Sequence, residues 1–305
     1  IRQDMIDLML VPGLSGHEER VARAIRDKLA VDGIATTSDR FGNLTATFPG
    51  DPAAPAVMLF THMDQLGFFV RKVEADGLIR VERMGGVSER AMAAQAVILC
   101  TEKGDVPGLI MNKAHHATGQ DEKYRVVTTP EIRIDTGHGS KAAVEAAGIR
   151  IGTPVVYRPQ VMELAGTRVA GTSIDDRAGC AVQIAVARRL ATRSGGPTVH
   201  CVWTVQEEFN LRGAQVAAQR LKPDCAIQID IALTSDTPDM ADKGELTLGG
   251  GPAISLYNFH GRGTLNGTIP HPAMVRLIEQ TAATAAIPLQ RYAMIGVLTD
   301  LAYVQ

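Results

Sequence analysis

Residues 56–65, AVMLFTHMDQ, join a compact apolar run to a polar His-x-Asp motif. An apolar run of this length, with the turn-forming residues DPAAP before it, is typical of a strand that is buried on both faces. Strands of this kind occur in sheets that carry helices on both sides. The segment therefore indicates an α/β fold, in which His62-Met63-Asp64 marks the end of a buried strand.

An amphipathic helix is predicted before this strand, within the segment GLSGHEERVARAIRDKLAVDG. Ser15 and Glu18 have the spacing of a capping box, which marks the start of a helix. Apolar residues then recur every four positions until Gly33, namely Val21, Ile25 and Leu29. The segment FGNLTATF, which follows the helix, is predicted as a further strand.

The sequence pattern changes at about residue 68. Short strand-like pieces such as FFVRKV, LIRVERM and AVILC follow one another there, separated by turn signals such as ADG and EKGD. Long helical patterns then return and alternate with strands, as in DDRAGCAVQIAVARRLATR followed by TVHCVWTV. This alternation predicts a mainly parallel sheet with helices on both faces. We therefore predict a three-layer α/β domain of residues 1–67 and 166–305, interrupted by a β-rich insertion of residues 68–165.

Composition excludes several classes of protein. The 305 residues are 45% hydrophobic and 21% charged, which excludes a disordered chain, a collagen and a coiled coil. The formal charge of -2 offers no basic field to nucleic acid or anionic lipid, so we expect neither as a partner. No apolar run reaches the roughly 18 residues of a membrane helix, and the N-terminal IRQDMIDLML carries charges where a signal peptide is apolar. The four cysteines form no C-x-x-C pair and lie in apolar stretches, which favours a reduced, cytoplasmic protein.

Acidic residues and one histidine follow the predicted buried strands or begin the long helix. Because ligands of open α/β sheets gather at the carboxyl ends of the strands, we expect these side chains to lie together. A histidine with several carboxylates and no cysteine is a ligand set suited to Zn²⁺, Co²⁺ or Mn²⁺ in a hydrolytic site. The candidate residues are His62, Asp64, Asp175, Asp176, Glu207, Glu208 and Asp230.

Each of these residues also has an ordinary structural interpretation. A His-x-Asp motif after a strand is more often a turn with a surface carboxylate, and motif matches carry false positives. Asp175 and Asp176 stand where helix capping and the helix dipole favour acids. Glu207 and Glu208 also fit a solvated helix start, and Asp230 fits a turn. Their equivalent places in the sheet favour the metal site, because clustered carboxylates repel one another unless a cation neutralises them.

Several motifs stand in the same order as in a known enzyme family. They include PGLSGHEERV, THMDQLGFFV, GTSIDDRAGCA, TVQEEFNLRGA, AIQID, LGGGPAIS, VLTDLA and, in the insertion, SKAAVEAAGIRIGTPV. With this combination, over nearly its whole length, the chain resembles the di-metal tetrahedral and glutamyl aminopeptidases. These are co-catalytic zinc exopeptidases, and some members carry the name cellulase or endoglucanase. The family's usual HMDE is HMDQ here, with Gln65 in place of the acid.

The resemblance implies a metallo-aminopeptidase with two divalent ions per subunit, zinc or cobalt, held by His62, Asp175, Glu208 and Asp230. Asp175 would bridge the two ions, since a carboxylate has two oxygens and can span metals about 3.5 to 4 Å apart. Glu207 matches the general base of the family, a role that requires a raised pKa. Asp64 matches the carboxylate that accepts the free ring N–H of the ligand histidine and orients it.

The resemblance also raises a question about the second metal site. In the family that site is completed by a histidine beyond the TD motif, here Thr299-Asp300, whereas this sequence ends at Gln305. We expect either that the natural chain continues or that the second site is incomplete. An incomplete site would favour the alternative of a catalytically silent oligomeric homologue. A glycan hydrolase is a weaker alternative, because such enzymes generally use two carboxylates without a metal pair.

Finally, the resemblance implies an assembly. Members of the family form dimers through the inserted barrel-like domain, here residues 68–165, and dodecamers that enclose a chamber. We therefore expect homo-oligomers of this chain, and short peptides able to enter the chamber as substrates. The preferred N-terminal residue and the native metal stay open, because sites of histidine and carboxylates accept several divalent ions.

Overall fold

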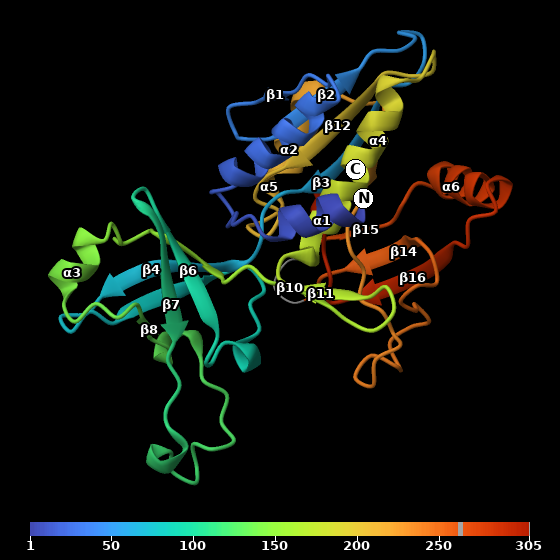
Figure 1. Cartoon of the computed structure of the whole chain (residues 1–305). Helices are drawn as coiled ribbons and strands as arrows, with labels where there is room; N and C mark the ends of the chain where they lie inside the picture. The colour runs from blue at the N-terminus through green and yellow to red at the C-terminus, as the bar shows by residue number, and fades with distance from the viewer. Residues whose placement is uncertain (262–264, 305) are drawn as a thin grey trace.

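The computed structural model describes residues 1–261 and 265–304, which form an α/β part and a β-barrel (Figure 1). The α/β part is built on a sheet of five strands in the order β1-β2-β12-β3-β13. In chain order these are β1 (Thr37–Ser38), β2 (Leu44–Phe48), β3 (Val57–His62), β12 (Val199–Thr204) and β13 (Cys225–Gln228).

The central sheet is mixed in its strand directions. β12, β3 and β13 are parallel, so their carboxyl ends lie at the same edge of the sheet. β2 is antiparallel to β12, and β1 is antiparallel to β2. A tight turn joins β1 to β2, and a loop without a helix leads from β2 to β3, which reverses the chain direction each time. The sheet is thus parallel where the polar motifs stand and antiparallel at its β1 edge.

Helices cover both faces of this sheet, as predicted. One face carries α1 (Arg2–Met9), α2 (Glu19–Val31) and α4 (Ile174–Ala191), which lie side by side in Figure 1. The other face carries α5 (Arg212–Leu221) and the short helix η4 (Asp300–Tyr303). Successive residues of a strand point to opposite faces. Cys201 and Trp203 of β12 therefore lie in the apolar core under α2 and α4, here called the first core, whereas Val202 lies in the core under α5. The predicted three-layer α/β arrangement is confirmed.

The chain between β3 and α4 forms a closed six-stranded antiparallel barrel in the order β4-β5-β8-β7-β6-β9. Its apolar interior includes Phe68, Val81, Leu99 and Val155. The predicted β-rich insertion is therefore a barrel, and it projects from the α/β part in Figure 1. Its strands are β4 (Gly67–Val73), β5 (Ile79–Met84), β6 (Ala96–Thr101), β7 (Gly104–Ile110), β8 (Ile134–Asp135) and β9 (Pro154–Tyr157).

Short helices lie in the connections between the barrel strands. Ser140 Oγ accepts a hydrogen bond from the backbone N–H of Ala143 at 3.3 Å and so caps α3 (Lys141–Ala146). The remaining turns are η1 (Glu89–Ala91), η2 (His115–Ala117) and η3 (Thr129–Glu131).

The rest of the chain adds two smaller sheets. The hairpin β10 (Val161–Glu163) and β11 (Val169–Gly171) leads from the barrel back into α4. After β13, a three-stranded sheet is formed by β14 (Ala253–Phe259), β15 (Gly267–Thr268) and β16 (Gln290–Ile295). The helix α6 (Pro272–Thr284) lies between β15 and β16 in the chain. Within the described residues, no helix combines the length and the apolar character that crossing a membrane requires.

The predicted capping box at Ser15 and Glu18 is wrong. Helix α2 begins at Glu19, and no side chain caps it. Glu18 instead accepts hydrogen bonds from the backbone N–H groups of Gly16, at 2.7 Å, and Gln206, at 3.0 Å. The Ser15 hydroxyl donates a hydrogen bond to Asp64, just beyond β3. Two long-range partners at the ends of β3 and β12, Asp64 and Gln206, therefore take the place of the capping bonds that the sequence spacing suggested.

Candidate metal centre

A cavity of about 270 Å³ opens at the edge of the central sheet where β3, β12 and β13 end. Because these strands are parallel, the residues that follow them meet at this edge. The structure brings five of the predicted residues together in the wall of this cavity, from four segments that are far apart in the sequence. They are His62, Asp175, Glu207, Glu208 and Asp230.

His62, the last residue of β3, lies at the centre of this group, and its side chain is only 1% exposed. Its Nε2 atom is 2.9 Å from Asp175 Oδ1 and 3.9 Å from Asp230 Oδ1. One possible ligand atom from each of these three residues falls within 4.8 Å of the other two. Burial lowers the pKa of His62, but the charge of Glu207 and the carboxylates bonded to the ring outweigh it and raise this pKa well above 6.5.

Asp64 lies behind His62 and is completely buried. Its Oδ1 atom is 3.4 Å from His62 Nδ1, and it accepts a hydrogen bond from the backbone N–H of Glu207 at 2.9 Å. Its Oδ2 atom accepts bonds from the backbone N–H of Glu208, at 3.0 Å, and from the Ser15 hydroxyl. Burial raises the pKa of Asp64, but His62 and these donors outweigh it, so the pKa is lowered. An ionised Asp64 favours the ring orientation that turns Nε2 of His62 toward the cavity.

Asp175 and Asp176, which are joined by a cis peptide bond, have different roles. The side chain of Asp175 is 45% exposed and lines the cavity. Asp176 is completely buried, and its carboxylate accepts hydrogen bonds from the backbone N–H of Gly179, at 2.9 Å, and from the Thr61 hydroxyl. The backbone becomes regularly helical only after Asp176, so this residue caps α4. A side chain at Gly179 would collide with the Asp176 carboxylate and with the Thr61 hydroxyl, which explains why this residue is a glycine. Asp176 is therefore a helix cap, whereas Asp175 is a residue of the cavity wall.

Glu207 and Glu208 follow β12 and crowd the same cavity. Burial raises the pKa of Glu207 well above its ordinary value, and the neighbouring acids Asp300 and Asp230 add to this against the opposing charge of His62. Burial likewise raises the pKa of Glu208 to about 7, with a further contribution from Asp175. The group is thus a set of acids that disfavour one another's ionisation.

This donor set fits a divalent cation. It offers one imidazole nitrogen and several carboxylate oxygens, which are ligands of Zn²⁺, Co²⁺ and Mn²⁺. His62, Asp175 and Asp230 present their atoms close enough together to share one ion. A cation there would also offset the repulsion among the buried acids that raises their pKa values.

Two further residues at this site come from the motif VLTDLA, for which the sequence indicated no role of their own. The Thr299 hydroxyl donates a hydrogen bond to Asp230 Oδ2. Asp300 is completely buried; its Oδ2 accepts a bond from the Thr204 hydroxyl at 2.9 Å, and its Oδ1 has no hydrogen-bond partner among the described residues. Burial raises the pKa of Asp300 to about 7, and the nearby Asp64 and Asp230 raise it further. The family motif was the signal for both, but only the packing of η4 shows what they contact.

Gln65, which stands where the family has an acid, lies away from the cavity. Its Oε1 atom accepts hydrogen bonds from the backbone N–H of Gly13, at 3.2 Å, and from Arg177 Nη2, at 3.3 Å. The completely buried Arg177 also donates to the carbonyl oxygens of Leu8, at 3.2 Å, and Val11, at 3.3 Å. The exchange of acid for amide therefore concerns the attachment of the N-terminal segment and leaves the cavity lining unchanged.

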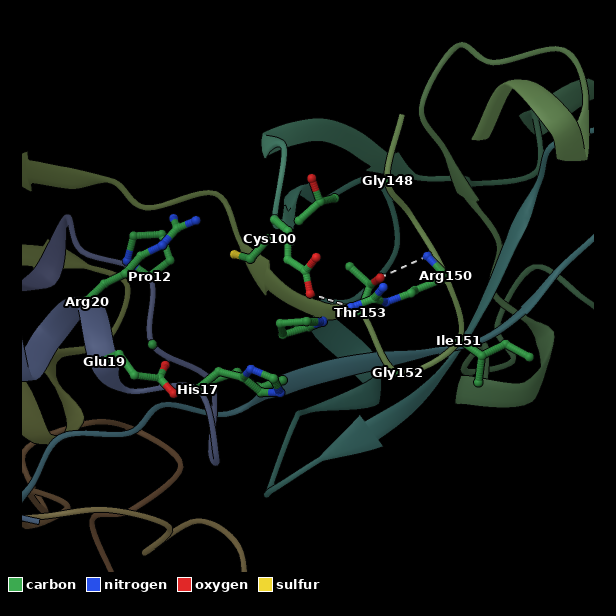
Figure 2. A pocket seen from close by; sticks show the side chains of 15 residues that line it. Pro12, His17, Glu19, Arg20, Cys100, Gly148, Arg150, Ile151, Gly152 and Thr153 are labelled. Atoms are coloured by element: carbon green, nitrogen blue, oxygen red, sulfur yellow. Dashed lines mark hydrogen bonds and ion pairs between the residues drawn. The ribbon is translucent and has the colours of Figure 1, made fainter. Parts of the chain in front are cut away.

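A second cavity of the same volume, about 270 Å³, lies between the start of α2 and the barrel (Figure 2). Both arginines that line it already have partners within the protein. Arg150 pairs with Glu102, and Arg20 pairs with Asp105 at 2.8 Å. Volume does not distinguish the two cavities, but only the first collects a histidine and four carboxylates.

Comparison with known proteins identifies the family. The model of the M42 glutamyl aminopeptidase family matches residues 42–305. The chain belongs to this family. The protein SgcX of Escherichia coli is 39% identical to it over 307 residues, which cover 100% of this chain and 82% of SgcX.

Solved structures agree with this assignment. The aminopeptidase APDkam598 from the archaeon Desulfurococcus kamchatkensis has a TM-score of 0.89 and 31% identity, covering 98% of this M42 chain and 81% of its own. The TET1 peptidase of Pyrococcus horikoshii has a TM-score of 0.88 and 25% identity, with coverage of 99% and 86%. The resemblance seen in the sequence is confirmed, and the M42 chain is a metal-dependent aminopeptidase.

Proposed function

We propose that this chain removes the N-terminal residue from short peptides at two divalent cations held in the strand-end cavity, with Glu207 as the general base. The observation that carries this proposal is the convergence of His62, Asp175 and Asp230, whose ligand atoms lie within 4.8 Å of one another. Glu207 and Glu208 line the same cavity, so the acids that would hold ions and move protons share one space.

In this proposal His62, Asp175 and Asp230 hold one ion, and Asp175 and Glu208 hold the other. The half-exposed carboxylate of Asp175 has two oxygens and is therefore suited to face both ions. When bound, Zn²⁺ or Co²⁺ ions lower the pKa of a water molecule and polarise the carbonyl of the peptide. The buried Asp64 keeps the ring of His62 in place, and Thr299 does the same for Asp230 through its hydroxyl.

Glu207 is suited to take a proton from the attacking water and to return it to the leaving amine. Its position is fixed, because its backbone N–H is bonded to the buried Asp64 at 2.9 Å. The residue is 9% exposed, so its carboxyl group works in a site that is mostly shielded from bulk water. A glutamate held in this way can act as base and then as acid in one cycle.

The charge of the cavity favours the amino end of a peptide. Among the described residues that line it there are four carboxylates and neither lysine nor arginine. Three of these carboxylates are proposed to hold the ions, but Glu207 is not, so a free α-amino group, which is largely protonated near neutral pH, would still find one carboxylate partner there. A blocked N-terminus lacks this charge, so we expect the enzyme to act as an exopeptidase.

We further propose that the chain assembles through the barrel domain, residues 68–165. The TET1 peptidase, which shares the fold, can assemble into a tetrahedron or a large octahedral shell. Several large apolar side chains of this domain are exposed here, among them Leu109, Met111, Tyr124 and Ile151. Native mass spectrometry of the complete chain tests the assembly, and a stable monomer at micromolar concentration would contradict it.

A cytoplasmic location is also part of the proposal. All four cysteines are free, and Cys180 and Cys201 are buried in the first core. Free thiols of this kind are usual in reducing compartments. Cell fractionation tests the location directly.

The activity is tested with pairs of peptides that differ only in their N-terminus. The protein is loaded with Zn²⁺ or Co²⁺ and incubated with a short peptide and with its N-acetylated form, and released amino acids are measured. We expect release from the free peptide alone, and loss of release in chelator. Equal cleavage of both peptides would refute the proposed aminopeptidase activity. No cleavage of either peptide at any concentration of Zn²⁺ or Co²⁺ would refute the proposal that this chain is an active peptidase.

A further inference from the structure

The strand-end cavity is lined by two chemically different sets of residues. Besides the histidine and the carboxylates described above, its lining contains apolar side chains, here called the apolar wall, and the polar residues Asn258, Tyr292 and Thr299; the apolar wall consists of Ile231, Leu233, Met294, Val297 and Leu298. Ile231 and Leu233 follow Asp230 directly, and Val297 and Leu298 follow β16. A ligand that reaches the acids therefore also meets an apolar wall.

Met294 on β16 belongs to this apolar wall. Alternate residues of this strand point to opposite faces, and Tyr292 and Met294 are half-buried residues that line the cavity. In the parallel pairing, Met294 stands opposite Asn258 of β14, which also lines the cavity and is 4% exposed. The part of the lining outside the acids is thus built from regular sheet as well as from loops.

No basic side chain serves this part of the cavity among the described lining residues. Arg291 is the one basic residue of β16, but it is exposed on the opposite face from Met294 and pairs with Glu279 at 2.8 Å. Of the four acids that line the cavity, three are proposed to hold the ions and the fourth, Glu207, is the proposed base. Among the described lining residues, a charged substrate side chain against the apolar wall would therefore find no free counter-charge.

We infer that this wall selects peptides whose first residue is neutral and apolar, such as leucine or methionine. The inference rests on the proposed function, which places the α-amino group and the peptide carbonyl at the acidic residues. A glutamate side chain against the apolar wall would lose its hydration without gaining a partner, which is costly for a charged group. A lysine side chain would lose hydration without gaining a carboxylate, although Ile231 and Leu233 are exposed enough to let its end reach water.

The first test uses aminoacyl p-nitroanilides of Leu, Met, Ala, Lys and Glu with the metal-loaded full chain. We expect the kcat/KM for Leu and Met to exceed that for Glu by about a hundredfold, and that for Ala by about tenfold. Equal or higher values for Glu or Lys would overturn the inference but leave the proposed aminopeptidase intact. Failure to hydrolyse any of the five would instead count against the proposed function.

The second test changes Met294, with Ile295 as the matched control. Ile295 neighbours Met294 on β16 but is 74% exposed on the other face. Met294→Ala should lower the ratio of kcat/KM for Leu over Ala by about tenfold, because an apolar contact with the substrate is lost. Ile295→Ala should leave this ratio unchanged. An unchanged ratio in Met294→Ala, or equal changes in both variants, would overturn the assignment.

A charge swap and a binding measurement complete the test. Met294→Arg should raise the ratio of kcat/KM for Glu over Leu by at least about tenfold, since it supplies the missing cation. Calorimetry of the metal-loaded protein with the products L-leucine and L-glutamate measures their dissociation constants without catalysis. L-leucine should bind more tightly than L-glutamate to the unaltered chain. Tighter binding of L-glutamate to the unaltered chain would refute the inference even if the variants failed to fold.

Discussion

Asp64 accepts a hydrogen bond from the backbone N–H of Glu207 at 2.9 Å, although the two residues stand 143 positions apart in the sequence. The same carboxylate lies 3.4 Å from the ring of His62. One buried anion thus joins the end of β3, which carries the histidine, to the end of β12, which carries the glutamates. The distance between the proposed ligand and the proposed base is therefore fixed by Asp64.

Substitution of Asp64 should affect both the metal and the fold. We expect Asp64→Asn to lower metal affinity or activity by about ten- to a hundredfold, because the partner of the ligand histidine is lost. We expect Asp64→Ala to cost a further ~1–3 kcal/mol of unfolding free energy for each buried N–H left unpaired. Metal analysis and urea unfolding measure the two effects. The exposed Asp121→Asn is the control, and an equal effect there would contradict this reading.

Ser15 should prove to be a positioning residue. Its hydroxyl donates to Asp64 Oδ2, and it is 3% exposed. A hydrogen bond to a charged group is worth about 1.5–3 kcal/mol, so Ser15→Ala should destabilise the protein by that amount and weaken metal binding as well. The exposed Ser194→Ala should change stability by no more than about 0.5 kcal/mol. If Ser15→Ala left metal affinity unchanged, the hydroxyl would be structural only.

These contacts show how far the sequence leads. The run AVMLFT and its counterparts predict buried parallel strands, and the rule that their ends meet at one edge brings His62, Glu207 and Asp230 together. Asp175 lies at the start of α4 instead, so this rule does not place it. The same reasoning misassigns Ser15, because a capping box is a local pattern and its actual partner, Asp64, is 49 residues away. The direction of β2 is not predictable from its sequence for a related reason: its apolar pattern is the same whichever way the strand runs.

The adjacent residues Glu207 and Glu208 should fail in different ways. Glu207→Gln should keep the metal content and lower kcat by about 10²- to 10⁴-fold, the range expected for loss of a general base. Glu208→Gln should instead reduce the number of ions bound per chain. Metal content by mass spectrometry and kcat on an unblocked peptide distinguish the two. If Glu207→Gln bound less metal but kept its kcat once saturated with metal, Glu207 would be a metal ligand rather than the general base.

Acid should weaken the attachment of α1 through Asp4. Its carboxylate bonds to Lys28 Nζ at 3.0 Å and to Arg188 Nη1 at 2.7 Å, and its side chain is 12% exposed. Burial raises the pKa of Asp4, but the hydrogen bonds and charges of Lys28 and Arg188 outweigh it, so the folded-state pKa is lowered from 3.8. A lowered folded-state pKa stabilises the protein above the unfolded-state pKa of about 3.9, and this stabilisation is lost as the pH falls through the folded value.

Asp4→Asn should accordingly reduce the unfolding free energy at pH 7 by about 1 kcal/mol. The difference between the variant and the unaltered protein should shrink steadily below about pH 4, where the unaltered carboxylate begins to take up its proton. Urea unfolding of both proteins across this pH range measures it, with the exposed Asp121→Asn as the control. A difference that stayed constant down to about pH 2 would show that Asp4 acts by packing rather than by charge.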